Sequence, residues 1–110
     1  MKFEIKRNEQ KNLSRYVNED VNIARQFARI MYKEFGNFIP CLVLFGSAAQ
    51  NLPSPKRDID ILIVLDDVRI KFTRELVETY RILTERAIAQ VEPKRLHVQS
   101  MKLTAFWEYI

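Results

Sequence analysis

The chain has 110 residues, 47% hydrophobic and 29% charged, which suits one folded domain and excludes a disordered or linker-rich chain. Its net charge of +4 comes from dispersed cations, which favours a solvated mixed-charge surface and leaves nucleic-acid binding undecided. The single cysteine, Cys41, excludes an internal disulfide and fits a reducing compartment. Because neither a signal peptide nor a membrane-spanning segment is evident, we expect a soluble cytoplasmic protein without a membrane role.

The first half of the chain predicts a strand, a helix and a second strand. Residues 2–6 alternate between apolar and polar types, as a half-exposed strand does. Apolar residues then recur every three or four positions over 18–35, which predicts an amphipathic helix with Asn18 as its N-cap and Asp20 in its first turn. Gly36 supplies the left-handed residue that ends this helix, and the apolar segment 38–46 predicts a buried strand.

Four elements are predicted in the second half, after a loop that contains two prolines. They are a buried strand at 58–67, a helix at 73–91, a strand at 95–101 and a short aromatic helix or tail at 103–110. Thr73 is the expected N-cap of the long helix, and Pro93 prevents its continuation.

This order of elements predicts an α+β fold in one domain spanning residues 1–110. The expected architecture is a small mixed β-sheet with helices packed mainly on one face. The loop before the strand at 58–67 suits antiparallel neighbours. The helix at 73–91 suits a right-handed crossover between parallel strands.

Asp58 and Asp60 are unusual because they open an otherwise apolar strand. Residues i and i+2 of a strand point to the same side, so we expect both carboxylates at the rim while Ile59 and Ile61 face the core. Two carboxylates this close repel each other unless a cation lies between them. Mg²⁺ is the natural cation, because it prefers carboxylate, phosphate and water oxygens.

Gly46 and Ser47 follow the preceding buried strand and suit an anionic group. Free backbone N–H groups at a helical turn, together with a serine hydroxyl, bind phosphate, and a glycine allows close approach. If the two strands pair antiparallel, this turn and the two aspartates meet at one edge of the sheet.

The segment LFGSAAQNLPSPKRDIDILIVLDD, residues 44–67, resembles the signature of minimal nucleotidyltransferases of the DNA polymerase β-type superfamily. The order of elements is also similar, so the resemblance covers nearly the whole chain. It implies that Gly46 and Ser47 bind the phosphates of ATP or another nucleoside triphosphate. It also implies that Asp58 and Asp60 are catalytic and hold two Mg²⁺ ions, while an acceptor hydroxyl attacks the α-phosphorus and pyrophosphate leaves.

The sequence departs from the family pattern at three places. It has GSAAQN where many minimal members have GSRARG, and Arg57 where a serine often precedes the first aspartate. Where the superfamily usually has a third acid, His97 occupies the expected slot and Gln99 the next inward-facing position. His97 is able to bind a metal or accept a proton, but a structural role is favoured. Glu92 is a second candidate for the missing acid.

Two functions therefore stay open on the sequence alone. The first is a Mg²⁺-dependent nucleotidyltransferase. The second is a catalytically weak or inactive binding subunit, similar to antitoxins, that acts through a HEPN-type helical partner. The aromatic segment at 106–110 either covers the domain's own core or forms a homo-oligomer or partner surface.

Overall fold

The computed structural model describes residues 2–5, 14–45 and 58–109, and the side-chain environment from residue 18 onward. Its elements are the strands β1 (Lys2–Ile5), β2 (Cys41–Phe45), β3 (Ile59–Leu65) and β4 (Leu96–Lys102), the helices α1 (Ser14–Phe35), α2 (Arg74–Val91) and α3 (Leu103–Tyr109), and the 3₁₀ turn η2 (Gly36–Phe38). These elements confirm the predicted α+β class and the predicted order of helices and strands.

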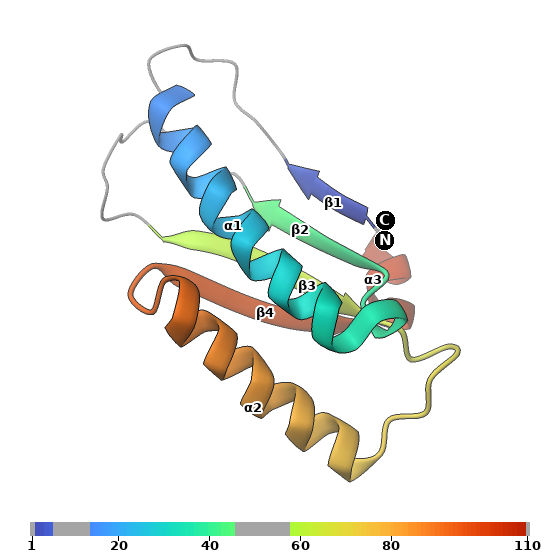
Figure 1. Cartoon of the computed structure of the whole chain (residues 1–110). Coiled ribbons are helices and arrows are strands. Elements are labelled where there is room, and N and C mark those ends of the chain that lie inside the picture. Colours follow the sequence, from blue (N-terminus) through green and yellow to red (C-terminus); the bar gives the residue numbers. More distant parts are fainter. Residues whose placement is uncertain (1, 6–13, 46–57, 110) are drawn as a thin grey trace.

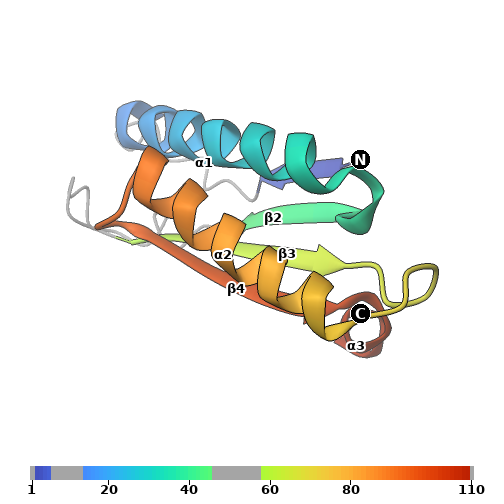
Figure 2. The ribbon, with the colours of Figure 1, turned by 60° about the horizontal axis from the view of Figure 1, so that its bottom comes forward.

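The four described strands form one mixed sheet in the order β1-β2-β3-β4. β2 and β3 are antiparallel, as predicted for the two strands on either side of the loop that contains two prolines. β3 and β4 are parallel and are joined through α2, while β1 adds a parallel edge strand beside β2. The helices α1 and α2 cover one face of this sheet (Figures 1 and 2), and α3 follows directly from the end of β4.

The alternating residues of β3 are buried on both faces of the sheet. Ile59, Ile61 and Ile63 belong to the large core that α1 and α2 complete. Leu62 and Val64 belong to a smaller apolar cluster on the other face, where residues of α3 pack. Because Asp60 shares the parity of Leu62 and Val64, the strand directs its side chain away from the two long helices.

The predicted helix boundaries are correct where a capping residue or a helix-ending glycine marks them in the sequence. The Thr73 hydroxyl accepts a hydrogen bond from the Leu76 N–H at 3.1 Å, which confirms the cap of α2. Gly36 has φ +50°, which confirms its left-handed conformation. The prediction for Asn18 was wrong, because α1 already begins at Ser14 and Asn18 lies inside the helix. In the sequence Val17 lies four positions before Val21 and already continues the apolar spacing, but the two acids that follow Asn18 favoured Asn18 as the cap.

Two of the predicted strands are longer than the strands in the structure. The strand expected from residue 38 begins at Cys41, because Phe38 belongs to the turn η2 and Pro40 lacks a backbone N–H group. The strand expected to end at Asp67 ends at Leu65. The Asp66 carboxylate accepts the backbone N–H groups of Val68 and Arg69, each at 3.0 Å, and so closes a turn after β3.

Asp67 connects this turn to α3. Its carboxylate accepts hydrogen bonds from the Thr104 N–H at 3.1 Å and from the Thr104 hydroxyl at 2.6 Å. The bond from the hydroxyl is the main reason why the pKa of Asp67 lies below its ordinary value. This carboxylate therefore fixes the end of the sheet at which α3 starts.

We expect Thr104→Val to raise the pKa of Asp67 towards its ordinary value, as measured by NMR titration, whereas Thr104→Ser keeps it low. Because the pKa is depressed in the folded state, the bond stabilises the fold above the unfolded-state pKa of about 3.9. That stabilisation is lost as the pH falls through the folded-state pKa. An Asp67 pKa that is equally low in Thr104→Val would contradict this assignment.

Candidate active site

The predicted acidic pair lies where β3 begins. Asp58 immediately precedes the strand and Asp60 is its second residue. In the sheet register Asp60 stands between Phe45 of the antiparallel strand β2 and His97 of the parallel strand β4. The end of β2, the start of β3 and the start of β4 therefore meet at one rim, as the strand directions require.

Asp60 and His97 line a common hollow at this rim. The hollow has a volume of about 280 Å³, and its other lining residues are Phe45, Ile61 and Gln99. Asp60 is half-buried, whereas His97 and Gln99 are exposed. His97 therefore lies beside the acidic pair and not in the hydrophobic core. Asp60 sits next to the residue that occupies the third-acid slot.

The Asp58 carboxylate lies beside the His97 imidazole, and the two form an ion pair only when the imidazole is protonated. The distance between the His97 Nε2 and the Asp58 Oδ1 is 3.5 Å, and both side chains are more than half exposed, at 58% and 53%. An exposed pair of this kind contributes little to stability. The contact shows where the imidazole lies, which is beside the two aspartates.

The donor set fits a hard divalent cation that takes further ligands from a substrate. Asp58 and Asp60 offer carboxylate oxygens, and Mg²⁺ typically takes one or two carboxylates together with phosphate oxygens and water. Within the described ranges, no group of three or more His, Cys, Asp or Glu side chains is arranged to hold a metal ion. Among the described residues, the ligands of such a site would therefore be the two aspartates.

The other predicted site residues differ in how far the structure locates them. Gly46 and Ser47, the predicted phosphate contacts, lie outside the described residues. Glu92 follows the end of α2, where its carboxylate accepts the Lys94 N–H at 3.3 Å, and it is not among the residues that line the hollow. Glu92 is therefore a helix-end residue rather than a member of this site.

Phe45 was not predicted as a site residue. Its side chain is 39% exposed although it ends a strand of buried residues, and it borders the hollow directly opposite Asp60 in the register. The sequence signal for this position was its place next to Gly46 together with antiparallel pairing. An apolar residue within an apolar strand otherwise predicts core.

A mixed sheet with paired aspartates at a strand start is an arrangement suited to nucleotidyl transfer, and comparison with known families agrees. The family model of the nucleotidyltransferase domain matches residues 24–106, and the chain belongs to this family. The match runs from α1 into α3 and includes Asp58 and Asp60. It confirms the resemblance drawn from the sequence and the fold class.

Two further comparisons give no match. Neither the curated proteins nor the solved structures include a protein that this chain matches. Among the helices of the described residues, none has the length and apolar character needed to cross a membrane.

Proposed function

We propose that this protein is a Mg²⁺-dependent nucleotidyltransferase that moves a nucleoside monophosphate from ATP or another nucleoside triphosphate to an acceptor hydroxyl. The observation that carries the proposal is the position of Asp60, which borders an open hollow at the start of β3 with Asp58 two residues away. Nucleotidyl transfer is the chemistry of the family to which the chain belongs. The nucleoside triphosphate is accordingly the expected substrate.

In this proposal the two aspartates anchor the reacting end of the nucleotide. Asp58 and Asp60 would hold Mg²⁺, which neutralises charge on the triphosphate when bound. Gly46 and Ser47 are the proposed phosphate contacts. The acceptor oxygen forms a bond to the α-phosphorus, the bond between this phosphorus and the bridging oxygen breaks, and pyrophosphate carries away the electron pair.

The proton of the acceptor hydroxyl has no third carboxylate to receive it within the described part of the site. His97 is the nearest candidate, since its imidazole lines the hollow with Asp60. A positioned general base typically contributes about 10²–10⁴-fold to a rate. We therefore expect transfer to be slow and limited by the residue at this position.

His97→Asp tests this expectation by placing an acid in the third slot. We expect the transfer rate to rise by about tenfold, less than a fully positioned base supplies, because the new carboxylate has no dedicated hydrogen-bond partners. His97→Asn is the matched control, because asparagine has the same size as aspartate but no charge and should not raise the rate. Equal rates for both variants would show that the third slot does not limit transfer.

Incubation with α-labelled ATP, Mg²⁺ and candidate acceptors tests the activity itself. Transfer of label that requires Mg²⁺ and disappears in both Asp58→Asn and Asp60→Asn is the expected result. The variant Asp67→Asn provides a matched control, because Asp67 lies beyond the opposite end of β3. Label transfer that survives both active-site changes would refute the assignment.

A binding subunit is the second candidate function. The observation that favours it is that no third acid joins the aspartates in the described part of the chain. Trp107 and Tyr109 of α3 are 62% and 79% exposed, which suits contact with a HEPN-type helical partner or with a second copy. In that case Trp107→Ala weakens partner binding while Asp60→Asn leaves it unchanged, as measured by calorimetry.

A further inference from the structure

Among the described strands, β4 forms one edge of the sheet. It is the last strand in the order of the described sheet and pairs there with β3. It has seven residues, contains no proline and carries a single lysine at its end, Lys102. Edge strands are usually protected by shortness, prolines, bulges or several charges, and β4 has little of this protection.

The outward backbone groups of β4 can be identified from its pairing with β3. The Arg95 carbonyl accepts the Ile59 N–H at 2.7 Å, which sets the parity of the ladder. The backbone N–H and C=O groups of successive residues in a strand point to opposite sides. The N–H and C=O groups of Val98 and Ser100 therefore point away from β3. These two residues present backbone donors and acceptors along this edge of the described sheet.

A groove lies between this edge and the helix α2, which is placed over the β4 side of the sheet (Figures 1 and 2). We call it the α2–β4 groove. Its wide end has a volume of about 500 Å³ and is lined mainly by Phe38, Leu65, Phe72, Val77, Tyr80 and Ser100. Its narrow end, of about 260 Å³, continues along Thr84, Ile88 and Val98.

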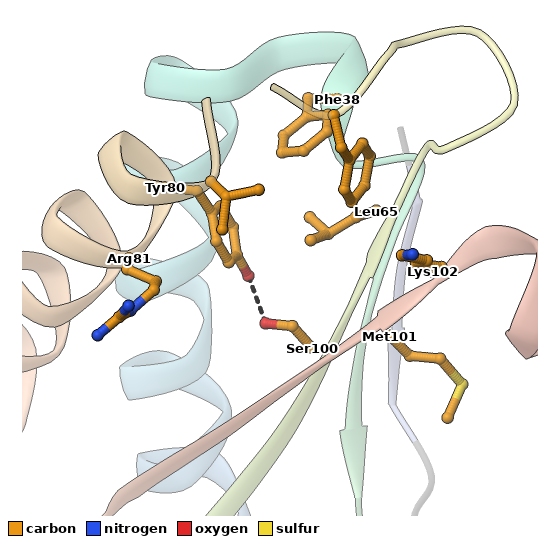
Figure 3. Close-up of a pocket in the computed structure, with 9 residues that line it drawn as sticks. Phe38, Leu65, Tyr80, Arg81, Ser100, Met101 and Lys102 are labelled. Atoms are coloured by element: carbon orange, nitrogen blue, oxygen red, sulfur yellow. Dashed lines mark hydrogen bonds between the residues drawn. The ribbon is translucent and has the colours of Figure 1, made fainter. Parts of the chain in front are cut away.

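The spacing of the groove matches the repeat of an extended chain. Tyr80 and Ser100 line both ends, and their hydroxyl groups form a hydrogen bond of 2.7 Å between α2 and β4 (Figure 3). Along β4 the narrow end begins at Val98 and the wide end reaches Lys102. In an extended peptide, side chains on the same side are two residues apart, about 6.6 Å. Two such side chains of a bound peptide could therefore enter the two ends of the groove.

The wide end of the groove is positively charged. Arg81 and Lys102 line it, and none of its lining residues is acidic. The Lys102 Nζ lies 5.7 Å from the centre of the Phe72 ring, so this ammonium stays beside the apolar wall. Arg81 also lines the narrow end, but there it is accompanied by the acidic Glu85. A ligand that complements these charges carries its carboxylate at the wide end.

We infer that the α2–β4 groove binds an extended peptide of a partner protein, which pairs with β4 as an added strand. Alternate apolar side chains of the peptide enter the groove, and an acidic side chain lies beside Arg81 and Lys102. Main-chain pairing supplies affinity in this mode of recognition, and the groove supplies specificity. The inference is independent of nucleotidyl transfer, because Asp60 points to the opposite face of the sheet.

Short labelled peptides test this inference with the full chain. The probes are seven-residue peptides of alternating valine and threonine with two aspartates at the N-terminal end or at the C-terminal end, and matched peptides with lysine in place of aspartate. We expect one aspartate peptide to bind in fluorescence anisotropy, and its lysine counterpart to bind about tenfold more weakly. Absence of binding by both aspartate peptides, or equal binding of the lysine peptides, would overturn the inference.

Two variants of α2 locate the binding surface. Val77→Glu places a negative charge in the wide end at a side chain that is already 39% exposed, and we expect it to weaken peptide binding by about tenfold. Ile82→Glu is the matched control, because Ile82 is 52% exposed on the same helix and does not line the groove. Equal effects of the two variants would contradict the site.

NMR and sedimentation separate the remaining outcomes. The bound peptide should protect the Val98 and Ser100 amides from exchange, and unchanged exchange at both would contradict strand addition. Sedimentation of the chain alone detects pairing between two copies. A dimer that Val77→Glu dissociates and Ile82→Glu does not would assign the groove to a second copy and overturn the peptide inference.

Discussion

Asp60→Asn is expected to lower the rate of nucleotidyl transfer by about 10³-fold, equivalent to about 4 kcal/mol of transition-state stabilisation. The change removes one negative charge and keeps the shape of the side chain. Asp60 is half-buried at the start of β3, where it borders the hollow shared with His97. The loss should therefore appear in the rate of transfer, measured with α-labelled ATP at saturating Mg²⁺, and not in the fold.

Two controls make this result specific. Thermal unfolding and circular dichroism should be nearly unchanged in Asp60→Asn, because the two carboxylates at the rim repel each other in the absence of a cation. Asp67→Asn, beyond the other end of β3, should retain the wild-type rate. A tenfold or smaller loss in Asp60→Asn would mean that this carboxylate does not hold the reacting end of the nucleotide.

Asp20→Ala should destabilise the protein by about 3–5 kcal/mol, the usual cost of leaving one member of a buried ion pair without its partner. The Arg95 Nη2 lies 2.5 Å from the Asp20 Oδ1, and the two side chains are only 13% and 3% exposed. The pair connects α1 to the residue that precedes β4. Urea unfolding monitored by circular dichroism measures the loss.

An exposed ion pair in the same protein provides the control. Arg74 and Glu78 form an i,i+4 pair at 3.3 Å with side chains 89% and 59% exposed, so Arg74→Ala should cost well under about 1 kcal/mol. Replacing both buried partners, as in Asp20→Leu with Arg95→Met, should recover most of the lost stability. A loss below about 1 kcal/mol in Asp20→Ala would show that the pair does not hold α1 to the sheet.

Most of the fold could be predicted from the sequence because its signals are local. The predicted range of α2 agrees with the structure to within one residue, since Thr73 caps the helix and an apolar stripe continues to Val91. The antiparallel pairing of β2 with β3 was predicted from the loop with two prolines that separates the two apolar segments. The start of α1 at Ser14 was missed because Asn18, followed by two acids, has the character of an N-cap, although Val17 already continues the apolar spacing.

Only those parts of the site that follow from the geometry of β-strands could be predicted from the sequence. The i,i+2 rule placed Asp58 and Asp60 together, and parallel pairing brought His97 beside them. Phe45 was missed because its exposure depends on how the sheet ends at this rim. The prediction that Gly46 and Ser47 face the aspartates lies outside the described residues and stays a prediction.

Interactions between residues far apart in the chain could not be predicted from the sequence. Asp20 was expected to act in the first turn of its helix, yet it pairs with Arg95, which is 75 positions away. The α2–β4 groove likewise depends on the lateral placement of α2 over the sheet edge. Periodicity identifies the apolar face of a helix but not how far that face covers the sheet.

Crystals of the protein with Mn²⁺ and a nonhydrolysable ATP analogue provide the most direct test of the proposed site. Anomalous scattering from Mn²⁺ locates the metal without any assumption about activity. We predict an anomalous peak within coordination distance of the Asp58 and Asp60 carboxylates, about 2–2.3 Å, with triphosphate oxygens completing the ligand set. A well-ordered nucleotide whose metal is bound elsewhere, with both aspartates facing solvent, would contradict the proposed site.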